Sequence, residues 1–192
     1  MRTLNSQTLQ DAIRLCSLTP NAKVYIVFCS KQSTNAFNRA ICSYENLPGV
    51  KSICSNRFAE EAKMEFLNGA LLQTKTLSEN LRGYKCDCLL TEDGMTLDEQ
   101  MALMNMEIPL RNSVVGKFYN SLSEYFTGQY GGIVGEYREI INRLYGSLVS
   151  EEMNTAMQSS SSKFVRYTPE PEGSDTLILD EFLDSFAVKE DE

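Results

Sequence analysis

The sequence predicts an α/β domain, and three observations support this prediction. Two runs are almost continuously apolar, "KVYIVFCS" at 23–30 and "KCDCLL" at 85–90, as expected for strands buried on both faces of a sheet. Segments with helical spacing of apolar residues lie before, between and after these runs. The pair Asn68-Gly69 between two short strand-like runs predicts a β-hairpin. Strands that alternate with helices in this way are typical of an α/β domain with a mostly parallel sheet.

The N-terminal part of the chain is expected to alternate between helix and strand. Residues 6–18 have helical spacing, and Thr19-Pro20-Asn21 ends this helix. A second helix is expected over 31–47, closed by Pro48-Gly49, and a short strand over 51–55. The apolar face of the first helix consists of Leu9, Ala12, Ile13 and Cys16.

The hairpin and the elements after it complete the predicted domain. The hairpin covers residues 64–74, and its Asn-Gly pair is the one best able to take the positive φ angles of a type I′ turn. On the second buried strand, Cys86 and Cys88 are two residues apart and are expected to face the same side. Residues 96–110 are expected to be helical, with Thr96 and Glu99 at the spacing of a capping box, and residues 117–149 mostly helical.

Composition and charge divide the chain into four segments. Residues 1–112 form the α/β core and 113–156 a helical extension, whereas 157–174, with four consecutive serines and two prolines, form a flexible linker before an acidic tail at 175–192. Residues 1–150 carry 15 acidic and 15 basic side chains, and residues 151–192 carry 11 and 3, so the net charge of −8 belongs to the C-terminal segment. A neutral body gives no overall electrostatic attraction to nucleic acid.

Several classes of site are excluded or disfavoured by the composition. The chain has no histidine, which excludes histidine-based acid–base chemistry and histidine-ligated metals. The six cysteines are scattered without a CxxC pair, which favours reduced thiols in a cytoplasm over disulfides or zinc. No apolar run approaches the roughly 18 residues that a membrane span needs, and the N-terminus lacks the apolar core of a secretory signal. We therefore expect a cytoplasmic protein, in a host cell if it is viral, that does not bind membranes.

The stretch "CLLTED" places Glu92 and Asp93 directly after a predicted buried strand. In nucleotide-hydrolysing α/β proteins, acids at this position lie at the ligand-binding edge of the sheet, where they hold magnesium and orient the attacking water. Solvated acids in an ordinary turn after a strand give the same pattern, so a purely structural interpretation stays open.

The order of elements around this acidic pair resembles the ATPase domain of tailed-phage terminase large subunits, which are DNA-packaging motors. The shared succession is a strand, a helix, an Asn-Gly hairpin, the pair Arg82-Gly83 and the acidic strand, from Thr8 to about Pro109. The resemblance implies a truncated P-loop or RecA-like sheet. It also implies that Glu92 and Asp93 correspond to the acidic Walker B pair, as vestigial catalytic residues and magnesium ligands.

The chain departs from this family in two ways. The acids occur as Glu-Asp, whereas the family has Asp-Glu. In the family, the first strand and the phosphate loop precede a helix that corresponds to residues 6–18, and we expect both to be absent here. Two internal stretches were considered as replacements for the loop. Gly116-Lys117 lacks the glycine five residues earlier and is followed by Phe118 in place of Ser or Thr, and "TGQYGGIVG" lacks a lysine. We therefore expect no cofactor, with Mg²⁺ and ATP binding only if another chain supplies the loop.

Basic side chains near the acidic strand are candidates for contact with phosphate or nucleic acid. They are Arg57, Arg82 and Lys85, and the alternative is that they are solvated loop charges.

The acidic tail is the candidate partner-binding element. Its large apolar residues have helical spacing with acidic residues between them, which is typical of a peptide that docks into a groove with a basic rim. The alternative is that the tail packs on its own domain. The residues concerned are Leu179, Phe182, Leu183 and Phe186.

These observations predict a viral, phage-type accessory of DNA packaging or processing that does not hydrolyse ATP alone and acts through protein partners. Two alternatives stay open: a half-enzyme completed by another chain that supplies the phosphate loop, and an unrelated α/β adaptor or inhibitor that docks through its tail.

Overall fold

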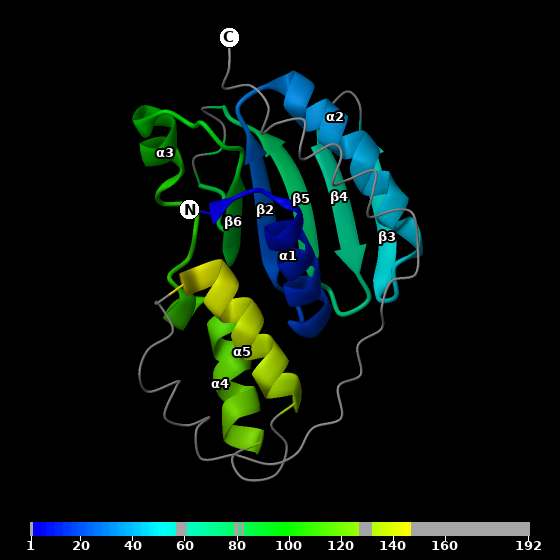
Figure 1. Cartoon of the computed structure of the whole chain (residues 1–192), viewed down its shortest axis with the longest axis vertical. Coiled ribbons are helices and arrows are strands. Elements are labelled where there is room, and N and C mark those ends of the chain that lie inside the picture. The colour runs from blue at the N-terminus through cyan, green and yellow to red at the C-terminus, as the bar shows by residue number, and fades with distance from the viewer. Residues whose placement is uncertain (1, 57–60, 79–80, 82, 127–131, 147–192) are drawn as a thin grey trace.

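The computed structural model describes residues 2–56, 61–78, 81, 83–126 and 132–146, which form a six-stranded mixed sheet and five α-helices (Figure 1). The strand order is β1-β6-β2-β5-β4-β3. The strands are β1 (Arg2–Thr3), β2 (Lys23–Phe28), β3 (Val50–Asn56), β4 (Glu61–Phe66), β5 (Leu71–Thr76) and β6 (Cys88–Thr91). The helices are α1 (Ser6–Leu18), α2 (Lys31–Ile41), α3 (Leu97–Leu103), α4 (Val114–Phe126) and α5 (Gly132–Tyr145).

The parallel part of the sheet is built around β2. This strand pairs in parallel with β6 on one side, Val24 opposite Cys88, and with β5 on the other, Val24 opposite Leu72. All residues of β2 after Lys23 are buried, which explains its continuous apolar run. The two apolar runs therefore supply two strands that are parallel neighbours in one sheet. β1 adds a short parallel edge next to β6.

The hairpin between β4 and β5 is present, but its turn is not of type I′. The amide of Gly69 donates to Phe66 O at 3.0 Å, and the amide of Phe66 donates to Ala70 O at 3.0 Å, so three residues form the loop. Only Gly69 among them has a positive φ, +81°. The turn needs glycine at this one position, and the expectation of two consecutive positive φ angles is wrong.

The side chain of Asn68 has a different role, at the end of α1. Its Nδ2 donates to Cys16 O at 2.8 Å and to Ser17 O at 3.0 Å, while its Oδ1 accepts from the amide of Ala70 at 3.0 Å. The last carbonyl groups of a helix have no partner within the helix. Asn68 therefore caps α1 from the hairpin and attaches the antiparallel half of the sheet to this helix.

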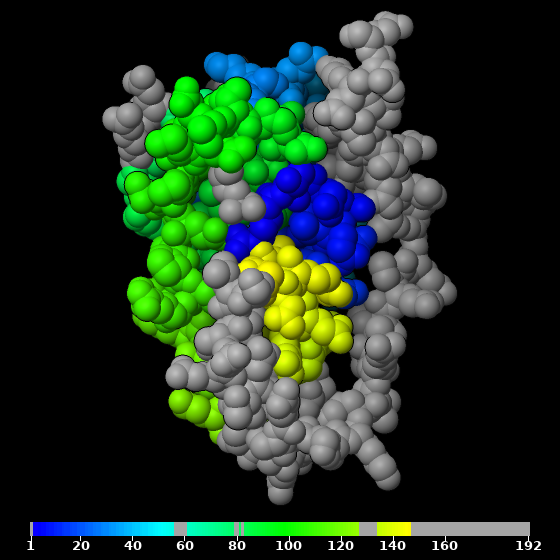
Figure 2. Space-filling model, turned by 60° about the vertical axis from the view of Figure 1, so that its left-hand side comes forward, coloured from blue at the N-terminus to red at the C-terminus, as the bar shows by residue number. Residues whose placement is uncertain are grey.

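Two apolar clusters cover the two faces of the sheet. The larger lies between the sheet and the helices α1, α2, α4 and α5, and the predicted face of α1 is buried in it. Figure 1 shows α1, α4 and α5 on the same side of the sheet, and Figure 2 shows α5, in yellow, lying against the N-terminal segment, in blue. The smaller cluster covers the opposite face with α3 and consists of Tyr25, Val27, Leu81, Cys86, Leu89, Met95, Leu103 and Met106.

The region around Cys86 differs from the prediction in two respects. The helix capped by Thr96 and Glu99 was expected to reach residue 110 but ends at Leu103. Glu107, which was expected to be helical, forms a parallel β-bridge with Cys86. Cys86 and Cys88 do not face the same side, because Cys86 lies in the smaller cluster and Cys88 in the larger.

Asp87 lies where the expected alternation of sides breaks. Its Oδ2 accepts from the amide of Lys23 and its Oδ1 from the amide of Val114, both at 2.8 Å. Regular β6 pairing begins only at Cys88, so the alternating rule of a strand does not extend back to Cys86.

Candidate functional site

The acidic pair lies at the edge of the sheet where the parallel strands β2, β5 and β6 end. Glu92 directly follows β6, and its amide donates to Val27 O of β2 at 3.0 Å. Cys29 and Ser30 follow β2 and lead into α2, and Thr76 is the last residue of β5. Polar groups from three strand ends therefore gather at one place, as expected for the ligand-binding edge of an α/β sheet.

The carboxylate of Glu92 is bound to the loop between β2 and α2. Its Oε2 accepts from the amide of Cys29 at 2.9 Å, and its Oε1 accepts from Ser33 Oγ at 2.8 Å. The side chain is half-buried. Each carboxylate oxygen has a donor, so Glu92 holds the start of α2 against the end of β6.

The hydroxyl groups around Glu92 form the N-terminal cap of α2. Ser30 Oγ accepts from the amide of Ser33 at 3.0 Å and donates to Ser33 Oγ at 2.9 Å. The Ser33 hydroxyl in turn donates a hydrogen bond to Glu92. Beside them, Thr34 Oγ1 and Thr76 Oγ1 are 2.8 Å apart. Sequence analysis missed this network, although a serine after a strand and three residues before a second serine is a recognisable helix-capping signal.

Asp93 is oriented differently from Glu92. It is exposed, and its Oδ1 accepts from the amide of Gly94 at 3.0 Å. The two carboxylates therefore engage separate backbone amides, with the Glu92 oxygens also engaged by a hydroxyl group. A shared magnesium site needs oxygen lone pairs that converge on one point, and magnesium binding by Glu92 and Asp93 stays a prediction.

The thiol of Cys29 lies beside Glu92, at the same edge. Partial burial and, after it, the negative charge of Glu92 raise the pKa of Cys29 to about 11. The thiolate is the nucleophilic form of cysteine. With a pKa of about 11, Cys29 is a protonated thiol at neutral pH.

The described residues form no phosphate-binding loop at the β1–α1 junction or at Gly116. β1 precedes α1, so a short first strand is present after all, but only Leu4 and Asn5 join them and neither is a glycine or a lysine. Asn5 uses its side chain to cap α1 by accepting from the amide of Thr8 at 2.8 Å. Gly116 lies inside α4, where a Cβ would be 1.9 Å from Leu110 O, so it permits close packing rather than a loop.

The remaining predicted site residues are not brought to this edge by any described contact. Lys85 is exposed, and its Nζ donates to Asn105 O. Arg57 and Arg82 lie outside the described residues, as do Leu179, Phe182, Leu183 and Phe186 of the tail and the glycines at 128 and 131.

One exposed apolar stripe lies on α3. Leu97, Met101 and Met104 lie on one side of α3 and its end, with 71, 60 and 71% of their surface exposed. The neighbouring Met95 and Met106 are buried in the smaller cluster. The methionines of this region therefore serve both the core and an exposed surface.

No family model, curated protein or solved structure matches this chain. In the part of the chain that the structure describes, no helix combines the length and apolar character needed to cross a membrane.

Proposed function

We propose that this chain is a phage-type, terminase-like accessory protein of DNA packaging or processing that does not hydrolyse nucleotides by itself. The observation that carries the proposal is the engagement of Glu92. Its carboxylate oxygens bind the amide of Cys29 and the hydroxyl of Ser33, which is a structural role at the position where a motor enzyme would hold magnesium.

The junction before α1 supports the same proposal. Phosphoryl transfer depends on backbone amides and a lysine that hold the β- and γ-phosphates. At the β1–α1 junction, Asn5 occupies the amide of Thr8 with its own side chain, and Leu4-Asn5 provides neither a glycine nor a lysine. A degenerate ATPase fold with these two features would act by binding protein partners. The exposed stripe on α3 and the acidic tail are the surfaces suited to protein partners.

The test measures magnesium-dependent nucleotide binding and phosphate release by the purified full-length chain. We expect phosphate release at the background rate, unchanged by Glu92→Gln or Asp93→Asn. Turnover that either substitution abolishes would overturn the proposal. Turnover that appears only when a second protein with a phosphate loop is added would instead favour the half-enzyme.

A further inference from the structure

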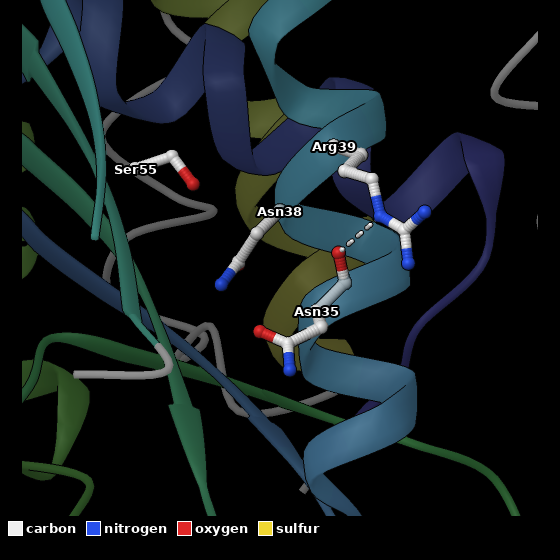
Figure 3. Close-up of a pocket in the computed structure, with 4 residues that line it drawn as sticks. All are labelled: Asn35, Asn38, Arg39 and Ser55. Carbon is white, nitrogen blue, oxygen red and sulfur yellow. Dashed lines mark hydrogen bonds between the residues drawn. The ribbon is translucent and has the colours of Figure 1, made fainter. Parts of the chain in front are cut away.

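A pocket of about 310 Å³ lies between α2 and the sheet, away from the acidic pair (Figure 3). Its described lining consists of Asn35, Asn38 and Arg39 from α2, and Ser55 from β3. The three helical residues are at positions i, i+3 and i+4, so they share one face of α2. Ser33, which binds Glu92, is two residues before Asn35 in α2 and is not among the described lining residues.

The orientation of the Asn38 amide is fixed by its neighbours. The amide of Ala62 donates to Thr74 Oγ1 at 2.7 Å, so the Thr74 hydroxyl is free to give its own proton to Asn38 Oδ1, also at 2.7 Å. The alternative acceptor for that proton, Ala62 O, is 3.5 Å away. Asn38 therefore presents its oxygen to Thr74 and its NH₂ group away from it.

The NH₂ group of Asn38 has no hydrogen-bond partner, although the residue is only 3% exposed. Buried side-chain donors in native proteins are almost always paired, and an exception calls for a water, an ion or a ligand. In Figure 3 the nitrogen of Asn38 points from α2 toward the sheet, on the Ser55 side. A ligand that accepts hydrogen bonds would satisfy it.

The lining also has the charge that suits such a ligand. Among the described lining residues, Arg39 is the one charged side chain, and none is acidic. Arg39 is exposed, and its Nε donates to Asn35 O in a long hydrogen bond of 3.4 Å. An exposed guanidinium held this weakly can turn toward a bound anion.

We propose that this pocket binds the oxyanion group of a small molecule, either a carboxylate or a phosphate monoester. Asn38 Nδ2 donates to the anion from the closed end, Ser55 Oγ and the Asn35 amide group donate from the sides, and Arg39 neutralises its charge at the rim. The volume is at the lower end of the range for ligand pockets, which fits a small metabolite. This inference is independent of the terminase-like proposal, because it uses none of the residues at the acidic edge.

The test is an amide NMR titration of the isotope-labelled full-length chain with inorganic phosphate and, separately, acetate, at constant ionic strength. We expect saturable shifts of the side-chain amide signals of Asn38 and Asn35 with at least one of the two probes, and the stronger probe identifies the preferred anion. Arg39→Gln is expected to weaken binding about tenfold through loss of a charge-assisted hydrogen bond. Arg14→Gln, an exposed arginine on α1, is the matched control and is expected to change nothing.

A second variant tests the closed end of the pocket. Asn38→Asp keeps an oxygen for Thr74 but replaces the donor with a carboxylate, so it is expected to abolish the saturable shifts. The backbone amide spectrum shows whether Asn38→Asp folds. If it does not fold, the comparison of Arg39→Gln with the wild type tests the proposal instead. Absence of saturation with both probes would overturn the proposal and leave a pocket that holds only water. Equal binding by wild type, Arg39→Gln and Arg14→Gln would overturn it as well.

Discussion

Replacing Glu92 separates a structural carboxylate from a catalytic one. Glu92→Ala removes the acceptors of the Cys29 amide and the Ser33 hydroxyl. A hydrogen bond to a charged group contributes about 1.5–3 kcal/mol. Because Glu92 is half-buried, water replaces part of both bonds, and we expect Glu92→Ala to lower the free energy of unfolding by about 2 kcal/mol and Glu92→Gln by about 1 kcal/mol.

The assay is urea denaturation of the full-length chain followed by circular dichroism, with the slope of the transition compared between variants. Asp93→Ala is the matched control, because this exposed side chain binds only the amide of Gly94 and its loss should change stability by less than about 0.5 kcal/mol. Replacing a catalytic residue often makes a protein more stable. If Glu92→Ala is as stable as the wild type or more stable, the carboxylate is not an anchor and the structural interpretation is refuted.

The same position has a second readout in the thiol of Cys29. Partial burial and the Glu92 charge raise the pKa of Cys29 to about 11, so Glu92→Gln should lower the pKa while the effect of burial stays. Alkylation of Cys29, followed by peptide mass spectrometry across alkaline pH, should then have its midpoint at a lower pH. The exposed Cys54 on β3 reports any general loosening and should not change. An unchanged midpoint would mean that the carboxylate is not beside the thiol.

Two further predictions concern the hairpin and the tail. Gly69→Ala should lower the free energy of unfolding by about 2–3 kcal/mol, because Gly69 has a positive φ and a Cβ there would be 2.5 Å from Asn21 Oδ1. Gly94 also has a positive φ, but a Cβ there would contact no other atom, so Gly94→Ala should lower the free energy of unfolding by about 1 kcal/mol. Equal melting temperatures for the two variants would contradict this. Phe182→Ala with Phe186→Ala should abolish partner binding without changing the melting temperature, and a drop of several degrees would mean that the tail belongs to the domain's own core.

The elements that the sequence predicted well are those with a local signal. Continuous apolar runs identified β2 and β6, the capping-box spacing identified the start of α3, and helical periodicity identified the buried face of α1. Each of these depends on residues within a few positions of each other. The Asn68-Gly69 pair was also a correct hairpin signal, although the turn differs from the expected type: Gly69 alone has a positive φ, and Asn68 caps the end of α1 while it accepts from Ala70 in the loop.

The candidate site was predictable only in part, because its contacts join distant segments. The position of Glu92 after a buried strand was evident from the sequence, but its partner Ser33 is 59 residues away. Periodicity does not say which hydroxyl or amide will face a carboxylate across a strand end. The bond between Thr74 and Asn38 is of the same kind, and it leaves a donor unpaired that no sequence pattern marks. The break at Asp87 likewise depends on backbone amides from two other elements.

The division of the sheet into two halves has a consequence for the order of assembly during synthesis. The strands β3, β4 and β5 pair with their sequence neighbours, so this antiparallel half can form as soon as residue 76 has left the ribosome. The parallel pair of β2 and β5 can form at the same stage, whereas β6 adds its pairs with β2 and with β1 only after residue 91 has been made. Contacts between distant segments form slowly because a long loop must close first. The Leu9 face of α1 packs against α5 as well as against the sheet, so it is fully covered only after residue 145 has been made, and a chaperone that binds apolar segments would find its substrate in this interval.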